Sequence, residues 1–490
     1  MRDNLTRRAG IIGASRLVAS SVVGLVVSVV LSRVFDPAVY GTFQQTWFLT
    51  QMTIEIALFG IPIGILYFVP RLTEPERRGL FLRVFLLLAG IGAVLAALLY
   101  GAAPHVSRLF DNPALEGTLR VFSLYALFLV PGIPMDAFLI AQERHRLLGL
   151  LTIAHSLLFL AAVFLPAALG LALAGILWAL VGYGALRAGL VFAAAATTVR
   201  SVRAAAGKGL LRRFVLYSIP VGLNDLLRVV GRWLDKTVVS AYFSPEVFAV
   251  YANGAVEIPF VGVLSGAIAS VMIPEFSRLS DEGKRGEVLA LWHRATVKTG
   301  VLLLPLFVFF MILAAPFLVF LFSETYRASA GPFRVYLLLL PLRSAAYAPI
   351  LLALGRPRLV ALGALGDVAL NLALSILLIP AFGYLGPAIA TVATTYAQAA
   401  FYLSCTSRLL SVSWRRVFPW MGIARLLLLS LVPAPLLLPL AGASLRPIVV
   451  LAIGTVLYFG PMILLMWRFG PLGESDKELV RRLLRISKSS

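Results

Sequence analysis

The chain is poor in charge for its length. Only 13% of its 490 residues are Asp, Glu, Lys or Arg, whereas soluble proteins average about 25%. The stretches between its apolar runs reach roughly 20 residues, and a folded soluble domain needs about 50. This composition excludes a sizeable soluble domain and predicts a chain that lies almost wholly within a membrane.

Cysteine and the signatures of catalytic sites are also scarce. Cys405 is the only cysteine, so the chain forms no internal disulfide and its redox compartment stays open. The sequence contains no phosphate-binding glycine loop, no cluster of metal ligands and no nucleophile–base pair at a recognisable spacing. We therefore expect no cofactor and no metal, and the composition argues against an enzyme.

Long apolar runs are abundant instead. Each run of 20 or more residues can cross a hydrocarbon core of about 30 Å as a helix. The first run is too long for a signal peptide and lacks a small-residue cleavage site, so it is expected to be a span. We predict an all-α polytopic membrane protein with about fourteen transmembrane helices, at approximately 11–34, 42–69, 80–103, 119–141, 147–168, 171–196, 213–239, 247–274, 296–322, 333–354, 359–379, 384–405, 420–441 and 447–467.

Positive charge is distributed unequally around these runs. The net charge is +21, and about 30 of the Lys and Arg residues lie in both termini and alternate loops, against about 7 in the other loops. This bias predicts that both termini are cytoplasmic and that the protein lies in the cytoplasmic (inner) membrane. It indicates anionic lipid rather than nucleic acid as the partner, and the basic tail 471–490 is expected to lie on the inner leaflet.

The sequence repeats itself. "DPAVYGTFQQ" (Asp36–Gln45) and "SPEVFAVYAN" (Ser244–Asn253) lie 208 residues apart, and three weaker matches follow at similar offsets. An offset of six spans is even, so the halves are parallel repeats, as in carriers whose substrate site lies between the halves. We expect a lobe at 1–205, a second lobe at 206–410, two extra helices at 411–470 and the tail at 471–490.

Three segments carry a family resemblance. "DVALNLALSILLIPAFGYLGPAIAT" (Asp367–Thr391), "GRWLDKTVVSAYFSPEVFAVYANGAVEIP" (Gly231–Pro259) and "LSRVFDPAVYGTFQQ" (Leu31–Gln45) resemble spans 11–12, 7–8 and 1–2 of the multidrug/oligosaccharidyl-lipid/polysaccharide (MOP) exporter superfamily. The last is most similar to the polysaccharide-transporter branch. The resemblance implies a two-lobed bundle that works by alternating access and flips an oligosaccharide on polyprenyl diphosphate to the outer leaflet, for surface polysaccharides such as O-antigen or exopolysaccharide.

Other branches of the superfamily remain alternatives. The lipid II flippases carry arginine-rich segments near spans 2 and 8 that are not recognisable here. Drug–cation exporters carry an acidic site in span 1, whereas this span has Arg16 and no carboxylate before Asp36. A membrane glycosyltransferase or polymerase is disfavoured because the outer loops are short. The extra helices, bent by Pro433, Pro435 and Pro439, form either a lipid-tail groove or ordinary packing.

Charges inside the expected spans form the candidate site. Asp225, Arg228, Arg232 and Asp235 recur at intervals of three, four and three, which puts them on one face of a helix. This stripe is expected to face the central cavity; the alternative is a set of ion pairs that holds the lobes in register. Asp235 and Lys236 alternatively cap the outer end of the helix.

We expect an arginine grip for a diphosphate, because arginine binds phosphate through a permanently charged, bidentate fork. Its members are Arg16, Arg228, Arg232 and Arg343. Arg16 aligns with Asn224 at the 208-residue offset, although it can instead snorkel to the surface. The side chains expected along the sugar path are Gln44, Gln45, Gln51, Glu55, Asn224 and Asn371, the last alternatively forming an interhelical hydrogen bond.

No nucleotide site supplies energy, so an ion gradient, the membrane potential or consumption of product must. The candidate carriers of H⁺ or Na⁺ are Glu55, Asp136, Asp225 and Asp367, because carboxylates inside membranes are costly and functional. Structural ion pairing is the alternative for these carboxylates and for Arg187 and Arg343. The protein is expected to be a monomer, with polysaccharide assembly proteins as candidate partners.

Overall fold

The computed structural model describes residues 22–197, 209–256 and 275–470, together with Ile258, Val261 and Met272. Every regular element in these ranges is an α-helix or a short 3₁₀ helix. Contacts between residues divide the chain into two compact units, Met1–Ala252 and Asn253–Ser490, and each is described by itself. The expected all-α class is therefore confirmed for the described part of the chain.

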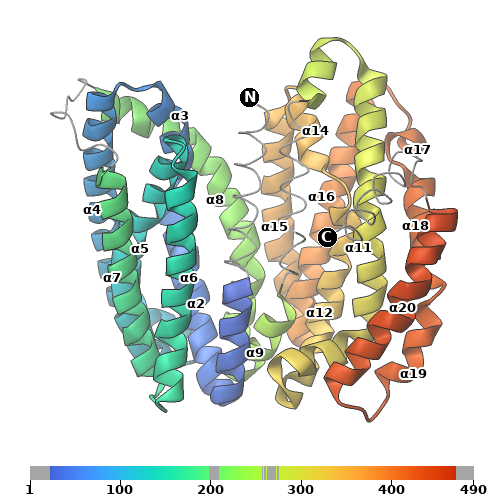
Figure 1. Cartoon of the computed structure of the whole chain (residues 1–490), viewed down its shortest axis with the longest axis horizontal. Helices are drawn as coiled ribbons and strands as arrows, with labels where there is room; N and C mark the ends of the chain where they lie inside the picture. The colour runs from blue at the N-terminus through green and yellow to red at the C-terminus, as the bar shows by residue number, and fades with distance from the viewer. Residues whose placement is uncertain are drawn as a thin grey trace, which may run out of the picture. The chain divides into compact units, whose positions relative to one another are not determined.

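The described part of the first unit consists mainly of long helices (Figure 1). A helix over Val22–Val34 precedes them. They are α2 (Pro37–Leu58), α3 (Ile61–Phe68), α4 (Glu74–Leu109), α5 (Ala114–Ala141), α6 (His145–Ala168), α7 (Leu173–Thr197), α8 (Leu210–Tyr242) and α9 (Pro245–Gly254). Local chemistry sets several starts: Pro37 occupies the first turn of α2, and the Glu76 carboxylate accepts hydrogen bonds from the Thr73 N–H and hydroxyl where α4 begins.

The second unit contains one long kinked helix and several broken ones. Its elements are α11 (Arg285–Phe322), α12 (Ala330–Leu337), α13 (Leu339–Arg343), α14 (Tyr347–Ala353), α15 (Pro357–Phe382), α16 (Gly386–Leu410), α17 (Trp414–Val417), α18 (Trp420–Leu431), α19 (Leu438–Ala441) and α20 (Pro447–Phe469). Leu313 has non-helical dihedral angles inside α11, three residues before Pro316. The Arg334 side chain donates to the carbonyl of Met311 at 3.1 Å, which satisfies backbone near this kink.

The helices have the length and composition of membrane spans. Ten described segments are apolar and long enough to cross a bilayer, or eleven if the bent pair Trp420–Leu431 and Ala434–Ala441 counts as one span. That pair bends by 40° at the expected proline cluster. The 54-residue segment Pro357–Leu410 contains both α15 and α16, separated by Gly383 at a φ of 56°. The protein is therefore a multi-pass membrane protein, while the count of fourteen stays a prediction.

Helix α8 belongs to the first unit by its contacts. It crosses α3 closely through glycines: a Cβ on Gly60 would lie 2.7 Å from the Ser218 carbonyl oxygen, and one on Gly222 would lie 2.5 Å from the Phe59 ring. The aromatic rings of Tyr67 and Tyr217 stack at 4.4 Å beside this crossing. The sequence repeat instead groups α8 with the spans that follow it. The predicted lobe boundary at 205/206 is therefore a boundary between sequence repeats, whereas the contact units divide at Ala252.

Candidate functional site

The middle of α8 carries three charged side chains. Asp225, Arg228 and Arg232 are residues 16, 19 and 23 of the 33 in this helix, which is about 50 Å long at 1.5 Å per residue. They therefore lie well inside a helix that is longer than the hydrocarbon core of about 30 Å. The exposed fractions of the two arginine side chains are 51% and 49%, so neither guanidinium is enclosed by protein.

Each arginine holds one carboxylate. The Nε and Nη2 atoms of Arg228 donate to Asp225 Oδ1 at 2.8 and 2.6 Å. Arg232 Nη1 donates to Glu55 Oε1 at 3.3 Å, and Trp233 Nε1 lies 3.4 Å from Glu55 Oε2. Glu55 is residue 19 of the 35 in the apolar segment Pro37–Arg71, so it lies at a similar depth on α2. We call Glu55, Asp225, Arg228 and Arg232 the charged patch.

The charged patch can bind an anion without a change in the positions of its side chains. A guanidinium has five N–H donors, and the carboxylates accept from only some of them. A half-exposed charge at mid-membrane must face water or a partner, because an exposed ion in lipid costs about 2.5–3.5 kcal/mol or more. An incoming phosphate can therefore reach free donors of both arginines while Asp225 and Glu55 keep the two side chains in position.

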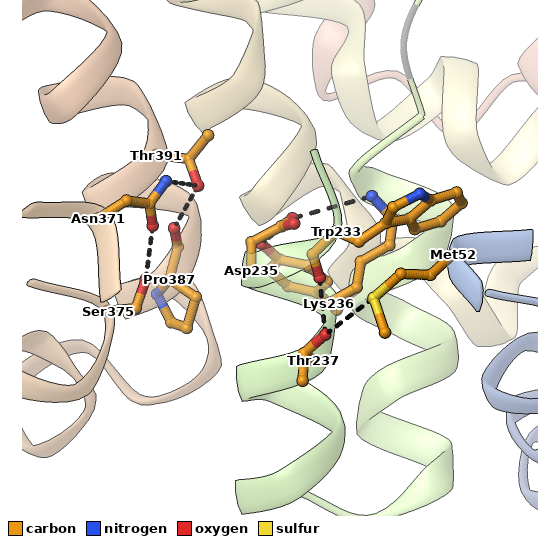
Figure 2. A network of polar contacts seen from close by, with 10 residues as sticks. Met52, Trp233, Asp235, Lys236, Thr237, Asn371, Ser375, Pro387 and Thr391 are labelled. Carbon is orange, nitrogen blue, oxygen red and sulfur yellow. Dashed lines mark hydrogen bonds and ion pairs between the residues drawn. The ribbon is translucent and has the colours of Figure 1, made fainter. Parts of the chain in front are cut away.

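Asp235 lies apart from the charged patch. Its side chain is 2% exposed and accepts a hydrogen bond from the Tyr251 hydroxyl at 2.8 Å. Figure 2 shows Lys236 between this carboxylate and the Trp233 ring, with Nζ 3.8 Å from Asp235 Oδ2 and 5.5 Å from the ring centre. Of the four residues in the expected stripe, the two arginines are therefore exposed, Asp225 is half-buried, and Asp235 is buried in contact with Tyr251 of α9.

The glutamines of α2 separate into two groups. Gln44 donates to the Tyr40 hydroxyl at 2.5 Å and, like Gln51, is only half-buried. Gln45 is fully buried and accepts from Asn112 Nδ2 at 2.7 Å. In this conformation the Gln45 amide is enclosed beside the turn between α4 and α5, and its expected place along a sugar path stays a prediction.

Asn112 is a residue that sequence reasoning missed. Its Nδ2 also donates to the Thr42 hydroxyl at 3.0 Å, and its carbonyl oxygen accepts from the Ser107 hydroxyl at 2.8 Å. It thereby ties α2 to the turn between α4 and α5. The Asp-Asn-Pro signal at 111–113 marks a turn, but nothing local reveals its partner 70 residues away.

Asp136 and Arg187 form an ion pair between α5 and α7. Arg187 Nη2 lies 3.1 Å from Asp136 Oδ2, and the exposed fractions of the two side chains are only 13% and 17%. Gly132, one turn before Asp136, lies against Ala188 of α7. Of the two alternatives for Asp136, this geometry favours a structural pair.

Asn371 lies inside the pair formed by α15 and α16. Its side chain is 1% exposed; Nδ2 donates to the Thr391 hydroxyl at 3.2 Å, and Oδ1 accepts from Ser375 at 2.9 Å (Figure 2). Thr391 in turn donates to the Pro387 carbonyl at 3.0 Å. In this conformation Asn371 joins α15 to α16 through Thr391 and contacts Ser375 one turn further along α15, and its expected place on a sugar path stays a prediction.

The remaining predicted residues divide by location. Arg343 is the last residue of α13, at the break before α14, and its side chain is exposed. Asp367 lies on α15, partly buried beside Thr394. Arg16, the tail 471–490 and the side chain of Asn224 lie outside what the structure describes.

Comparison with known proteins identifies the family. The family described as polysaccharide biosynthesis protein matches residues 30–331, more than half of the chain. None of the curated proteins matches the chain in sequence.

Solved structures share the fold. The lipid II flippase MurJ in an inward closed conformation is similar over 95% of this chain and 98% of that chain, with a TM-score of 0.68 and 15% identity. An inward-facing multidrug resistance MATE transporter is similar over 79% and 94%, with a TM-score of 0.66 and 14% identity. A MOP transporter from Pyrococcus furiosus is similar over 82% and 95%, with a TM-score of 0.56 and 15% identity. The chain thus belongs to the polysaccharide biosynthesis protein family, and it shares its fold with the lipid II flippase MurJ and with transporters of the MOP superfamily.

Proposed function

We propose that this protein is a flippase that moves polyprenyl-diphosphate-linked oligosaccharide from the inner to the outer leaflet, for assembly of a surface polysaccharide. The observation that carries the proposal is the charged patch, where two half-exposed arginines lie at mid-membrane depth on α8. A diphosphate is the part of such a glycolipid that most needs compensating charge in a membrane. Membership of a polysaccharide biosynthesis family supports this choice of cargo.

The chemistry assigns each part of the cargo a different environment. The diphosphate exchanges water for Arg228 and Arg232, whose planar guanidinium groups bind pairs of phosphate oxygens. The half-buried side chains of Gln44 and Gln51 offer amide donors and acceptors to sugar hydroxyls. The polyprenyl tail stays in lipid, since moving its apolar surface into a polar site would cost about 25 cal/mol per Å².

The same proposal includes the finer topology. Fourteen spans, cytoplasmic termini and the cytoplasmic membrane as location follow from the bias of positive charge toward alternate loops. Two parallel lobes at 1–205 and 206–410, followed by two extra spans, follow from the 208-residue repeat. Such an arrangement is suited to alternating access, in which a site near the midplane opens to one side at a time.

Two alternatives rest on specific observations. A cation-coupled exporter is favoured by the carboxylates Glu55 and Asp225 within the charged patch. A lipid II flippase is favoured by the structural similarity to MurJ, at an identity that supports the fold alone. The diphosphate is common to lipid II and the proposed glycolipid, so the sugar and peptide parts decide between them.

The test is reconstitution of the purified protein into liposomes with three fluorescent probes in turn. The probes are a polyprenyl-diphosphate oligosaccharide, lipid II, and an organic cation. We expect rapid quenching of the oligosaccharide probe from the opposite leaflet and slow quenching of the others relative to protein-free liposomes. Efflux of the cation alone, or scrambling of lipid II alone, would replace the proposal with the corresponding alternative.

A further inference from the structure

The acidic residues within the described spans differ in whether they face a cation. Glu55 contacts Arg232, Asp136 contacts Arg187, and Asp225 contacts Arg228. Among the described residues, Asp367 has no cationic side chain within ion-pair distance. It is residue 11 of the 26 in α15, about 15 Å along this helix, so it lies well inside the apolar segment.

Among the described residues, few hydrogen-bond donors reach the Asp367 carboxylate. Its Oδ1 atom is buried and has no hydrogen-bond partner. Tyr402, which lies near it on α16, donates its hydroxyl hydrogen to the Val360 carbonyl at 2.8 Å. Thr394 has one hydrogen, which it directs either to Asp367 or to the Thr391 carbonyl at 3.3 Å.

Among the residues that the structure describes, none forms an ion pair with Asp367. The described elements packed against α15 are α14, α16 and the turn Gly383–Leu385. The titratable or charged side chains on these elements and on α15 itself are Tyr347, Arg358, Tyr384, Tyr396, Tyr402, Cys405 and Arg408. The arginines Arg358 and Arg408 form no ion pair with Asp367, and the others are neutral at neutral pH.

We propose that Asp367 is the proton-binding site that couples transport to the proton gradient. A buried ionised carboxylate without a cation or enough donors is costly, whereas a protonated one carries its own donor hydrogen. That hydrogen can be accepted by the hydroxyl oxygen of Thr394 or Tyr402. The step is simple proton binding: the carboxylate takes up H⁺ from the outer side and releases it to the inner side as the glycolipid headgroup moves outward.

A proton fits this site better than a sodium ion. Na⁺ needs several oxygen ligands around it, and the described residues contain no group of three or more His, Cys, Asp or Glu side chains that could hold a metal ion. One carboxylate with two hydroxyl groups suffices for a proton. This inference rests on the proposed function, because coupling can be tested only if the protein moves glycolipid. Protonation of Asp367 can be measured by spectroscopy whatever the cargo is.

The first measurement is infrared spectroscopy of the purified full-length protein as pH is raised. We expect the wild type to show the carbonyl stretching band of a protonated carboxylic acid at neutral pH, and Asp367→Asn to lose it. Asp281→Asn, the same change at an exposed helix end, should keep the band. Thr394→Val should keep the band at a shifted frequency, because the acid loses a hydrogen-bond partner. Persistence of an unshifted band in Asp367→Asn would overturn the proposal.

The second measurement follows flipping in liposomes under an imposed pH gradient. One coupled proton lets a gradient of one pH unit change the ratio of glycolipid between leaflets by up to about tenfold. We expect this response in the wild type and in Asp281→Asn, and no response in Asp367→Asn, which should still scramble without a gradient. A response that persists in Asp367→Asn, or that requires Na⁺ instead, contradicts the inference. If no glycolipid moves at all, the proposed function fails while the infrared result still decides the proton site.

Discussion

Arg232 and Glu55 lie 3.3 Å apart although 177 residues separate them in the chain. The contact joins α8 to the last turn of α2, and Trp233 approaches the same carboxylate from the position next to Arg232. Glu55 therefore holds one arginine of the charged patch in place without enclosing it. This arrangement combines a fixed position with exposed donors, which is what recognition of an oxyanion requires.

The contact between Glu55 and Arg232 should be measurable as a coupling energy. Glu55→Gln, Arg232→Gln and the double variant form a double-mutant cycle in thermal or denaturant unfolding in detergent. We expect a coupling of about 0.2–1 kcal/mol, since both side chains are partly exposed and screened. Glu55→Gln combined with Arg77→Gln, whose arginine contacts Glu74 instead, is the matched control and should be additive. A coupling no larger than this control would contradict the assigned geometry.

Asn371 should be important for stability rather than for cargo. Asn371→Ala leaves Ser375 and Thr391 without their shared partner, which should lower the free energy of unfolding by about 1–3 kcal/mol. Transport per folded molecule should stay close to the wild type. The measurement is the unfolding midpoint together with flipping normalised to folded protein. A stable variant that no longer flips glycolipid would contradict this structural role and support contact between Asn371 and the sugars.

The crossing of α3 and α8 should not tolerate a side chain at Gly60. This residue has a φ of +72°, and its Cβ would meet backbone atoms of Ser218 and Gly222 at 2.7 Å. Gly60→Ala should therefore sharply reduce the yield of folded protein on size-exclusion chromatography. Gly90→Ala is the control, because a Cβ at that position on α4 has open space around it. Equal yields of the two variants would show that the crossing is looser than described.

Changing only one member of the Asp136–Arg187 ion pair should destabilise the folded protein. Asp136→Asn leaves a largely buried guanidinium without its counter-charge, a defect that costs about 3–5 kcal/mol at buried pairs. Combining it with Arg187→Gln removes the unpaired charge and should restore part of the lost stability. Thermal unfolding of the single and double variants provides the measurement. If Asp136→Asn is stable yet uncoupled from an ion gradient, Asp136 rather than Asp367 carries the ion.

Sequence patterns predicted the features that depend on local periodicity. Apolar runs indicated a multi-pass helical membrane protein, and the intervals between Asp225, Arg228 and Arg232 placed them on one face of a helix. The proline cluster near 433 predicted a bend, which the structure has. These features follow from neighbours in the chain, so the residue order contains the information.

Contacts between distant residues could not be predicted in this way. The sequence around Glu55 does not identify Arg232 as its partner, and the sequence around Asn112 does not identify Gln45. Gln44 and Gln45 look equivalent in sequence, yet one is half-buried and the other enclosed, because adjacent helix positions point about 100° apart. The isolated state of Asp367 likewise depends on which residues pack around it, and this decides among carboxylates that the sequence leaves equal.

The measurement that tests the central claim most directly is flipping by Arg228→Ala and Arg232→Ala in liposomes containing the fluorescent polyprenyl-diphosphate oligosaccharide. Arg278→Ala is the matched control, since Arg278 pairs with Glu275 at 2.6 Å and is 54% exposed, much as Arg228 pairs with Asp225. Losing a charge-assisted hydrogen bond costs about 1.5–3 kcal/mol, so each α8 variant should flip roughly ten to a hundred times more slowly. The account predicts this loss with normal folded yield and an unaffected control. Wild-type rates in both α8 variants would contradict it.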